Sequence, residues 1–366
     1  MKSSILFYRG VQGDNVFNHM NGLITSIPFN PTGWESGPAA AAGIAAFRGG
    51  VLLPNGKVFA IPYNYTGTST LYNPPTNAWQ TGPAGPGTGA FWGGVLLPNG
   101  KVFVIPFNYT GTNTIYNPVT NAWETGPAGP GPGSAFSGGV LLPNGKVFAI
   151  PAAYTGTNTI YNPVTNAWET GPTGPGGGAG VAFQGGVLLP NGKVFAIPSN
   201  YTGTNTIYNP SNPTVWETGP AAATGSSAFQ GGVLLSNGKV FAIPYNYTGT
   251  NTRYNPITNA WETGPAGPGT GAFASGVLLP NGKVFVMPAG YKGTNTIYNP
   301  VTNAWETGPA QYIFGSSNAF SGGVLLPSGK VFVIPCNDTT TDTIYNPAII
   351  GWPLGQWMLH PMYNKY

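Results

Sequence analysis

Short apolar runs alternate with turn-forming residues along almost the whole chain. A typical unit, beginning at Gly93, reads GGVLLPNGKVFVIP, where an Asn-Gly pair separates two apolar runs. Asn-Gly between such runs is the strongest short signal for a β-hairpin. The second run is apolar at successive positions, which predicts a strand buried on both sides. The phrases TNTIYN and AWETGP then predict two further strands, and no window shows a helical period.

This unit recurs along the chain with small changes. Copies begin 44 to 47 residues apart, at Gly49, Gly93, Gly138, Gly185, Gly231, Ser275 and Gly322. Four strands in such a period match one blade of a β-propeller. A sheet with two apolar faces must also pack against a neighbour on each side. We therefore predict an all-β protein, with residues 1–366 forming a single closed β-propeller of four-stranded antiparallel blades.

The number of blades depends on an eroded copy of the repeat near the N-terminus. Residues 25–38 read TSIPFNPTGWESGP, which aligns with TNTIYNPVTNAWETGP once two residues are dropped. With this copy, eight tryptophans are equivalent: Trp34, Trp79, Trp123, Trp168, Trp216, Trp261, Trp305 and Trp352. We predict eight blades, with 1–38 a degenerate first blade, 39–352 seven repeats, and 353–366 a C-terminal tail at the closing seam. The alternative is seven blades, with the N-terminal segment patching that seam.

Composition narrows the function classes. The 57 Gly and 38 Pro could suggest disorder, but 41% hydrophobic and 13% aromatic residues require a folded core. Only 6% of residues are charged, and no Lys/Arg run accompanies the net charge of +4, which argues against nucleic-acid binding. The single cysteine, Cys336, excludes an internal disulfide. No apolar run has the length of a signal core or membrane helix, so we predict no membrane insertion and a cytoplasmic or virion-associated protein.

Each copy resembles the kelch repeat in its galactose-oxidase-like form. The residues that carry the resemblance are Asn99-Gly100-Lys101, the phrase YNPVTN at 116–121, and Trp123. The likeness covers about nine-tenths of the chain. One departure is that Gly-Gly precedes the first strand, whereas kelch blades carry it after the second.

The resemblance implies an oxidase site that this sequence does not match. Galactose-oxidase-like enzymes hold copper with two His and two Tyr, one of them cross-linked to Cys. The two histidines here, His19 and His360, fall outside the matching blade positions. Neighbouring chain ends could bring them together, but a catalytic metal site needs a third protein ligand. We expect no enzyme activity, no cofactor and no metal.

Charged residues repeat around the predicted ring. A lysine follows each hairpin glycine (Lys57, Lys101, Lys146, Lys193, Lys239, Lys283, Lys330), and a glutamate follows most blade tryptophans (Glu35, Glu124, Glu169, Glu217, Glu262, Glu306). We expect weak, solvent-screened Lys–Glu pairs within blades. The alternative is a ring of cations that holds an anionic partner.

The loops between the second and third strands suggest a binding face. Antiparallel order puts them, with the connections between blades, opposite the Asn-Gly hairpins, and binding tends to concentrate in such variable loops. Six loops carry a central tyrosine beside Asn or Thr, which suits glycans or polar protein surfaces. The predicted site is Tyr65, Tyr109, Tyr154, Tyr201, Tyr247 and Tyr291. The alternative is that these tyrosines pack on the propeller and that Asn and Thr make turns.

The last connection between blades adds three apolar residues, Tyr312, Ile313 and Phe314. Exposed, they predict a protein contact; the alternative is burial in the central channel. We predict a non-enzymatic binding or adhesion propeller for glycans or a surface protein, acting alone, as a homo-oligomer or in a larger assembly. The alternative is a structural component of a virion or phage tail, and an oxidase-like enzyme ranks last.

Overall fold

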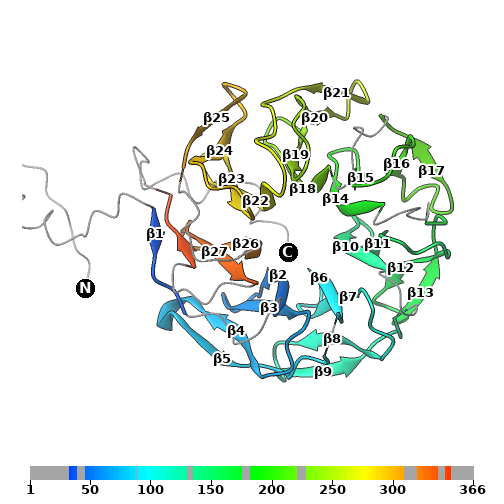
Figure 1. Ribbon diagram of the computed structural model, residues 1–366. Coiled ribbons are helices and arrows are strands. Elements are labelled where there is room, and N and C mark those ends of the chain that lie inside the picture. The colour runs from blue at the N-terminus through cyan, green and yellow to red at the C-terminus, as the bar shows by residue number, and fades with distance from the viewer. Residues whose placement is uncertain are drawn as a thin grey trace, which may run out of the picture. The chain divides into compact units, whose positions relative to one another are not determined.

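The computed structural model describes eight ranges of the chain, all of them within Gly33–Tyr366. They are residues 33–38, 46–87, 89–129, 135–174, 182–220, 228–308, 320–336 and 343–347. The strands in these ranges form seven four-stranded sheets, none of which closes on itself. Neighbouring strands are antiparallel, and the sheets stand around a common axis as the blades of a propeller (Figure 1).

Each blade is built outward from the axis. The innermost strands are β2 (Phe47–Leu52), β6 (Phe91–Leu96), β10 (Phe136–Leu141), β14 (Phe183–Leu188), β18 (Phe229–Leu234), β22 (Phe273–Leu278) and β26 (Phe320–Leu325). The second strands are β3 (Val58–Pro62), β7 (Val102–Pro106), β11 (Val147–Pro151), β15 (Val194–Pro198), β19 (Val240–Pro244), β23 (Val284–Pro288) and β27 (Val331–Pro335). Every residue of these second strands is buried, which confirms the prediction from their apolar pattern.

The two outer strands of each blade carry the Tyr and Trp phrases. The third strands are β4 (Ser69–Asn73), β8 (Asn113–Asn117), β12 (Asn158–Asn162), β16 (Asn205–Tyr208), β20 (Asn251–Asn255), β24 (Asn295–Asn299) and β28 (Ile344–Tyr345). The fourth strands are β5 (Ala78–Thr81), β9 (Ala122–Thr125), β13 (Ala167–Thr170), β17 (Trp216–Thr218), β21 (Ala260–Thr263), β25 (Ala304–Thr307) and β1 (Trp34–Glu35). One 3-10 turn, η1 (Pro74–Thr76), joins β4 to β5.

The prediction of eight blades is wrong, and its alternative of seven is correct. Strand β1 pairs with β28 and becomes the outermost strand of the seventh blade, with Trp34 opposite Tyr345 (Figure 1). Residues 33–38, the described part of the predicted first blade, therefore complete the last one. The segment suits this place because it keeps the two side chains that a fourth strand needs. Trp34 packs on Phe285 of the neighbouring blade, and Glu35 pairs with Lys330. Trp352 lies outside the described residues.

Paired glycines precede the valine-rich run in six of the seven blades, and Ser275-Gly276 stands in their place in the other. The first and second strands change register between Phe47 and Gly50, where Gly49 has φ +75°. Such a bulge favours glycine because the left-handed region strains other residues. A Cβ on Gly50 would lie 2.7 Å from Cδ1 of Ile334 in the adjacent blade. The second glycine thus lets neighbouring blades approach closely near the axis, where the ring is narrowest.

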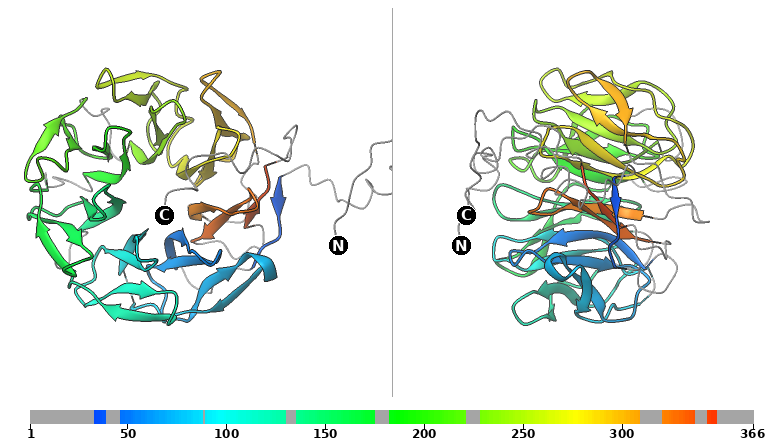
Figure 2. Two further views of the ribbon diagram at one scale, coloured as in Figure 1. Left: turned by 180° about the vertical axis from the view of Figure 1, so that it is seen from behind. Right: turned by 90° about the vertical axis from the view of Figure 1, so that its left-hand side faces the viewer.

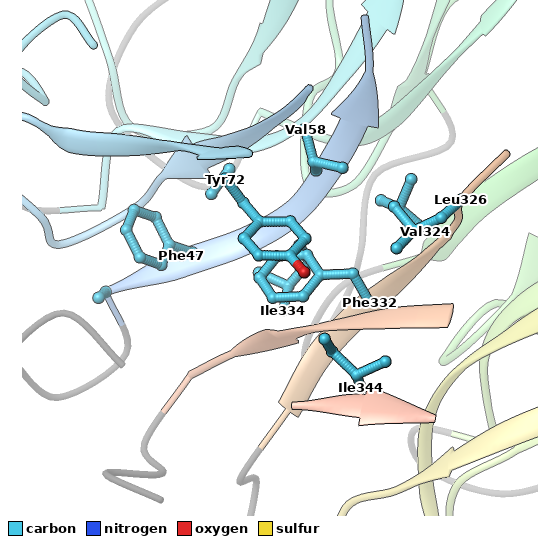
Figure 3. Packing of buried hydrophobic residues seen from close by; sticks show 10 residues of the cluster. Phe47, Val58, Tyr72, Val324, Leu326, Phe332, Ile334 and Ile344 are labelled. Atoms are coloured by element: carbon cyan, nitrogen blue, oxygen red, sulfur yellow. The ribbon is translucent and has the colours of Figure 1, made fainter. Parts of the chain in front are cut away.

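One aromatic stack recurs at every interface between blades. A second-strand phenylalanine lies against the third-strand tyrosine of the next blade, with ring centroids 3.8 to 4.2 Å apart. Figure 3 shows the interface that closes the ring, where Tyr72 of the first blade lies on Phe332 of the seventh. Val324 and Ile334 complete this core from the seventh blade. Aromatic pairs of this kind add about 0.5–1.5 kcal/mol each beyond the area they bury.

Polar contacts fasten the outer edges of the same interfaces. The indole N–H of Trp123 donates to the carbonyl of Ala84 in the preceding blade, and Trp168, Trp216 and Trp305 make the equivalent bond. Asn121 holds a left-handed conformation and donates to the carbonyl of Thr81, also across the interface. The repeated segment that reads YNPVTNAW at residues 116–123 therefore forms parts of the outer strands of its own blade and also makes hydrogen bonds to the preceding blade. Figure 2 shows the arrangement of the blades around the ring from behind and from one side.

The buried tyrosines predict a sharp alkaline transition. Burial raises the pKa of Tyr116 and Tyr161 to about 12, against about 10 for a free phenol. Because the folded-state pKa lies above the unfolded one, the neutral phenols stabilise the fold fully below pH 10. This contribution is lost as the pH rises through 12. Between about pH 10 and pH 12, we expect tyrosinate absorbance to increase while the near-ultraviolet circular dichroism signal decreases in parallel. Complete tyrosine titration near pH 10 with the dichroism intact would contradict the burial.

Candidate functional site

The innermost strands differ from blade to blade mainly at one position. This position lies between a phenylalanine that is constant in all seven blades and the paired glycines. We call its seven residues the axial ring: Arg48, Trp92, Ser137, Gln184, Gln230, Ala274 and Ser321. All seven line a single cavity of about 230 Å³ at the propeller axis. A repeat that is otherwise nearly constant thus places its most varied inner residues around one space.

The cavity lies toward the end of the inner strands from which the loops to the third strands depart. Phe47, at the start of its strand, pairs with Pro62 at the end of the next, and Tyr245 from one of these loops also lines the cavity. The Asn-Gly hairpins stand at the other end of the blades. The loop face that the sequence predicted for binding is therefore the face nearest this cavity.

Arg48 forms one side of the cavity together with aromatic rings. Its guanidinium carbon lies 4.5 Å from the ring centroid of Trp92 and 4.9 Å from that of Tyr63. Trp92 is in turn 4.3 Å from Phe107, between ring centroids. Cation–π contacts of this kind hold a guanidinium plane in a fixed position. The Arg48 Nε atom is buried and has no hydrogen-bond partner within the described part of the chain.

The other sides of the cavity are polar and neutral. The hydroxyls of Ser137 and Ser321 each accept the backbone N–H of a glycine in the next blade, Gly185 and Gly49 respectively, at 3.2 and 3.3 Å. Within the described ranges, the side-chain amides of Gln184 and Gln230 have no hydrogen-bond partner. Each of these amides can both donate and accept. The cavity therefore combines one fixed cation with neutral groups that suit hydroxyls and carbonyls.

The six predicted tyrosines do not line this cavity. Each is half-buried in its loop and lies against the first phenylalanine of its own blade, with ring centroids 4.9 to 5.3 Å apart. Two of them, Tyr65 and Tyr247, also accept a backbone N–H from their own loop. This geometry favours the packing alternative, and sugar binding by Tyr65, Tyr109, Tyr154, Tyr201, Tyr247 and Tyr291 stays a prediction.

The asparagines beside these tyrosines have a structural contact. The side-chain oxygen of Asn64 accepts the N–H of Gly89 at 2.8 Å, and Asn246 does the same for Gly271 at 2.9 Å. Both bonds join a loop to the connection that leads into the next blade. A contact between two loops therefore accounts for these two amides.

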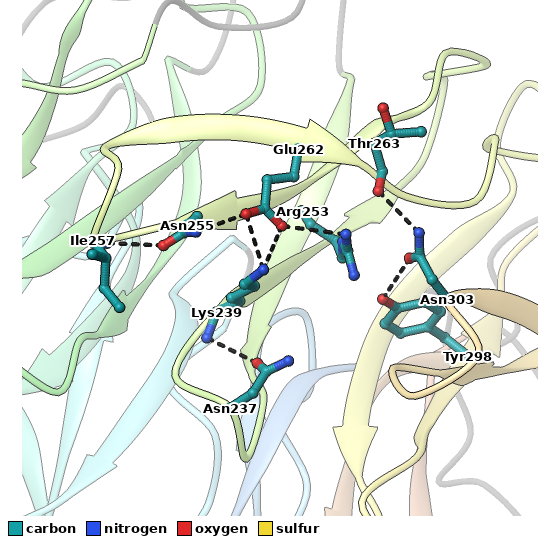
Figure 4. Close-up of polar contacts among 9 residues, drawn as sticks. All are labelled: Asn237, Lys239, Arg253, Asn255, Ile257, Glu262, Thr263, Tyr298 and Asn303. Atoms are coloured by element: carbon teal, nitrogen blue, oxygen red, sulfur yellow. Dashed lines mark hydrogen bonds and ion pairs between the residues drawn. The ribbon is translucent and has the colours of Figure 1, made fainter.

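The lysines and glutamates pair within blades as predicted. In six blades a lysine Nζ lies 2.5 to 2.7 Å from a glutamate oxygen. Figure 4 shows the pair Lys239–Glu262, to which Arg253 adds a contact of 3.2 Å. Hydrogen bonds from Lys101 and Asn117 hold the pKa of Glu124 below its usual range. With six of seven lysines neutralised in this way, the arrangement disfavours a ring of cations that holds an anionic partner.

Several predicted residues lie outside the described part of the chain. These are His19 and His360, and the proposed protein contact Tyr312, Ile313 and Phe314. Among the described residues no group of three or more His, Cys, Asp or Glu side chains could hold a metal ion. No helix in the described ranges is long and apolar enough to cross a membrane.

The axial ring is absent from the residues predicted above, although the sequence carries a signal for it. Aligning the repeats shows one changing residue between Phe and Gly-Gly, at Arg48, Trp92 and their equivalents. The predicted site consists instead of residues that recur in most blades, the loop tyrosines. In a ring of similar blades, the recurring residues make the packing contacts that every blade requires. Residues that change from blade to blade at an inner position instead give the central cavity a varied lining.

Comparison with known proteins defines the fold. No protein-family model matches the sequence, and no curated protein matches it. The chain is similar to a streptogramin B lyase structure, with a TM-score of 0.61 at 14% identity over 82% of this chain and 94% of that one. It is also similar to hydrazine synthase of Kuenenia stuttgartiensis, with a TM-score of 0.60 at 12% identity over 85% of this chain and 98% of that one.

A third similar structure is the extracellular domain of a putative one-component system from B. thetaiotaomicron. The TM-score is 0.55 at 12% identity, over 85% of this chain and 39% of that one, so this chain spans about two fifths of that domain. At such identities the likeness shows the propeller fold alone. The resemblance to the kelch repeat stays a prediction.

The packing of the loop tyrosines can be tested with a matched pair of variants. Tyr154→Ala removes a ring that lies 5.1 Å from Phe136, and we expect it to lower the free energy of unfolding by about 1–3 kcal/mol. Tyr154→Phe keeps the ring, and we expect a change within about 1 kcal/mol. Denaturant unfolding measures both. If Tyr154→Ala were as stable as the natural chain, the ring would be free for another role.

Proposed function

We propose that this protein is a non-enzymatic binding propeller that holds a small polar ligand in the cavity lined by the axial ring. The observation that carries the proposal is the concentration of sequence variation at this one inner position. Five residue types occupy the seven axial positions, whereas the phenylalanine before them is the same in every blade. Packing requirements are similar in all blades, so they do not account for this variety.

The chemistry of the cavity supports binding. Its lining brings an arginine, amides, hydroxyls and aromatic rings together in a concave space. A few polar groups converging in a preformed cavity, with aromatic surface beside them, are typical of small-molecule sites. The cavity is built on the innermost strands of seven rigid blades, which hold such groups more precisely than loops do. The tyrosine-bearing loops surround the same face and would shape access to it.

A structural role in an assembly is the second candidate, and a separate surface supports it. Four turns between third and fourth strands carry an apolar residue that is 91 to 92% exposed: Val119, Val164, Ile257 and Val301. These turns lie on the face of the Asn-Gly hairpins, opposite the loops. Apolar residues repeated at one height on several blades suit contact with another flat protein surface. Their place on the other face makes the two candidates separable by mutation.

Filling the cavity tests the proposed function. The full chain is screened by ligand-observed NMR against a panel of neutral, acidic and amino monosaccharides and small organic acids. Gln184→Trp places a large ring in the cavity, and we expect it to weaken binding of every panel member that the natural chain binds by at least about tenfold. Val164→Asp changes the opposite face and should leave binding within about twofold.

Two results would contradict the axial site. One is a panel member that binds the natural chain and the Gln184→Trp variant equally well. The other is a panel in which nothing binds, which would leave the assembly role as the better supported candidate. Circular dichroism of both variants confirms that the fold is kept.

A further inference from the structure

Arg48 differs from the other described cations in its surroundings. Arg253 and six of the lysines have a carboxylate partner, and Lys57 and Lys292 stand outside the cavity. Arg48 alone lines the cavity, and among the described residues it has no carboxylate partner. Arg48 is only partly exposed, its Nε is buried, and no described carboxylate faces its charge, so the group suits a counter-charge that arrives with a ligand.

The setting of Arg48 favours a planar anion. Its guanidinium carbon lies 4.5 Å from the ring centroid of Trp92 and 4.9 Å from that of Tyr63, and these aromatic contacts hold the group in place. The N–H groups at its edge project in a fixed fork that matches the two oxygens of a carboxylate. A lysine in the same place would offer a point charge without this geometry.

The remainder of the cavity fits hydroxyl groups. Gln184 and Gln230 contribute amides from the fourth and fifth blades, and Ser137 contributes a hydroxyl from the third. Neutral amides and hydroxyls exchange hydrogen bonds with alcohols without a change of charge. The volume of about 230 Å³ is below the roughly 300–1,000 Å³ of pockets for drug-sized ligands. The occupant is therefore small.

We infer that the ligand of this cavity is a sugar acid, whose carboxylate binds the guanidinium of Arg48 and whose hydroxyls bind the amides of Gln184 and Gln230. This inference rests on the proposed function, because it assigns a chemical class to the ligand of the same cavity. It extends that function by predicting discrimination between a sugar and its acid. It also assigns the charge recognition to a single blade.

The test compares D-glucuronate, D-glucose and inorganic phosphate as probes, with affinities measured by NMR titration of the full chain. We expect glucuronate to bind at least about tenfold more tightly than glucose or phosphate, since a charge-assisted pair and the hydroxyl contacts both contribute. Arg48→Gln should weaken glucuronate binding by at least about tenfold and glucose binding by a clearly smaller factor. Arg48→Lys should restore only part of the affinity, because it lacks the fork.

Lys292→Gln is the matched control. It removes the same charge from an exposed position on a loop of the same face, outside the cavity lining, and should leave all three affinities within about twofold. An effect equal to that of Arg48→Gln would show general attraction by surface charge and overturn the inference. Near-ultraviolet circular dichroism shows that each variant keeps its aromatic packing.

The remaining outcomes separate this inference from the proposed function. If neutral sugars bind as tightly as glucuronate and Gln184→Trp abolishes both, the axial site stands and the acid class is wrong. If phosphate binds as well as glucuronate, with the same dependence on Arg48, the site recognises anions in general and the sugar acid is again wrong. If no probe binds and the wider panel is also blank, both proposals fail.

Discussion

The structure depends on the aromatic stack between a second-strand phenylalanine and the third-strand tyrosine of the next blade. It occurs at all seven interfaces, from Tyr116 on Phe59 to Tyr345 on Phe285, with centroids about 4 Å apart. A single four-stranded blade would leave both of its apolar faces in water, so each blade is stable only beside its neighbours. The ring closes where the first and seventh blades meet. There Tyr72 of the first blade stacks on Phe332 of the seventh, and β1, from the N-terminal part of the chain, adds Trp34 to the seventh blade as its outermost strand.

This constraint explains where the sequence is free to vary. The glycine equivalent to Gly50 must admit the isoleucine or methionine of the adjacent blade, and the phenylalanine equivalent to Phe47 is fully or almost fully buried. Between them, the axial side chain faces the central space and contacts no obligatory partner in every blade. Seven such positions can therefore change without loss of the interfaces. These positions carry a charged, an aromatic and two amide side chains, those of Arg48, Trp92, Gln184 and Gln230.

Much of the fold could be predicted from the sequence because the repeat encodes local structure seven times. The hairpins, the doubly buried second strand and the Lys–Glu pairs follow from spacing and polarity within one unit. The blade count could not be predicted in this way, since residues 33–38 suit a fourth strand in any blade and only the pairing of Trp34 with Tyr345 decides which. The axial site depends on ring closure in the same manner. Arg48 and Gln230 share a cavity only after the blades surround one axis.

The most direct test of this account separates the scaffold from the axial ring. Serine already stands at two axial positions, so Arg48→Ser, Trp92→Ser, Gln184→Ser, Gln230→Ser and Ala274→Ser combined give a ring of seven serines. Denaturant unfolding and the ligand panel are then measured on one preparation. The account predicts a variant that still unfolds cooperatively and binds none of the ligands held by the natural chain. A variant that cannot fold, or one that folds and keeps its ligands, would contradict it.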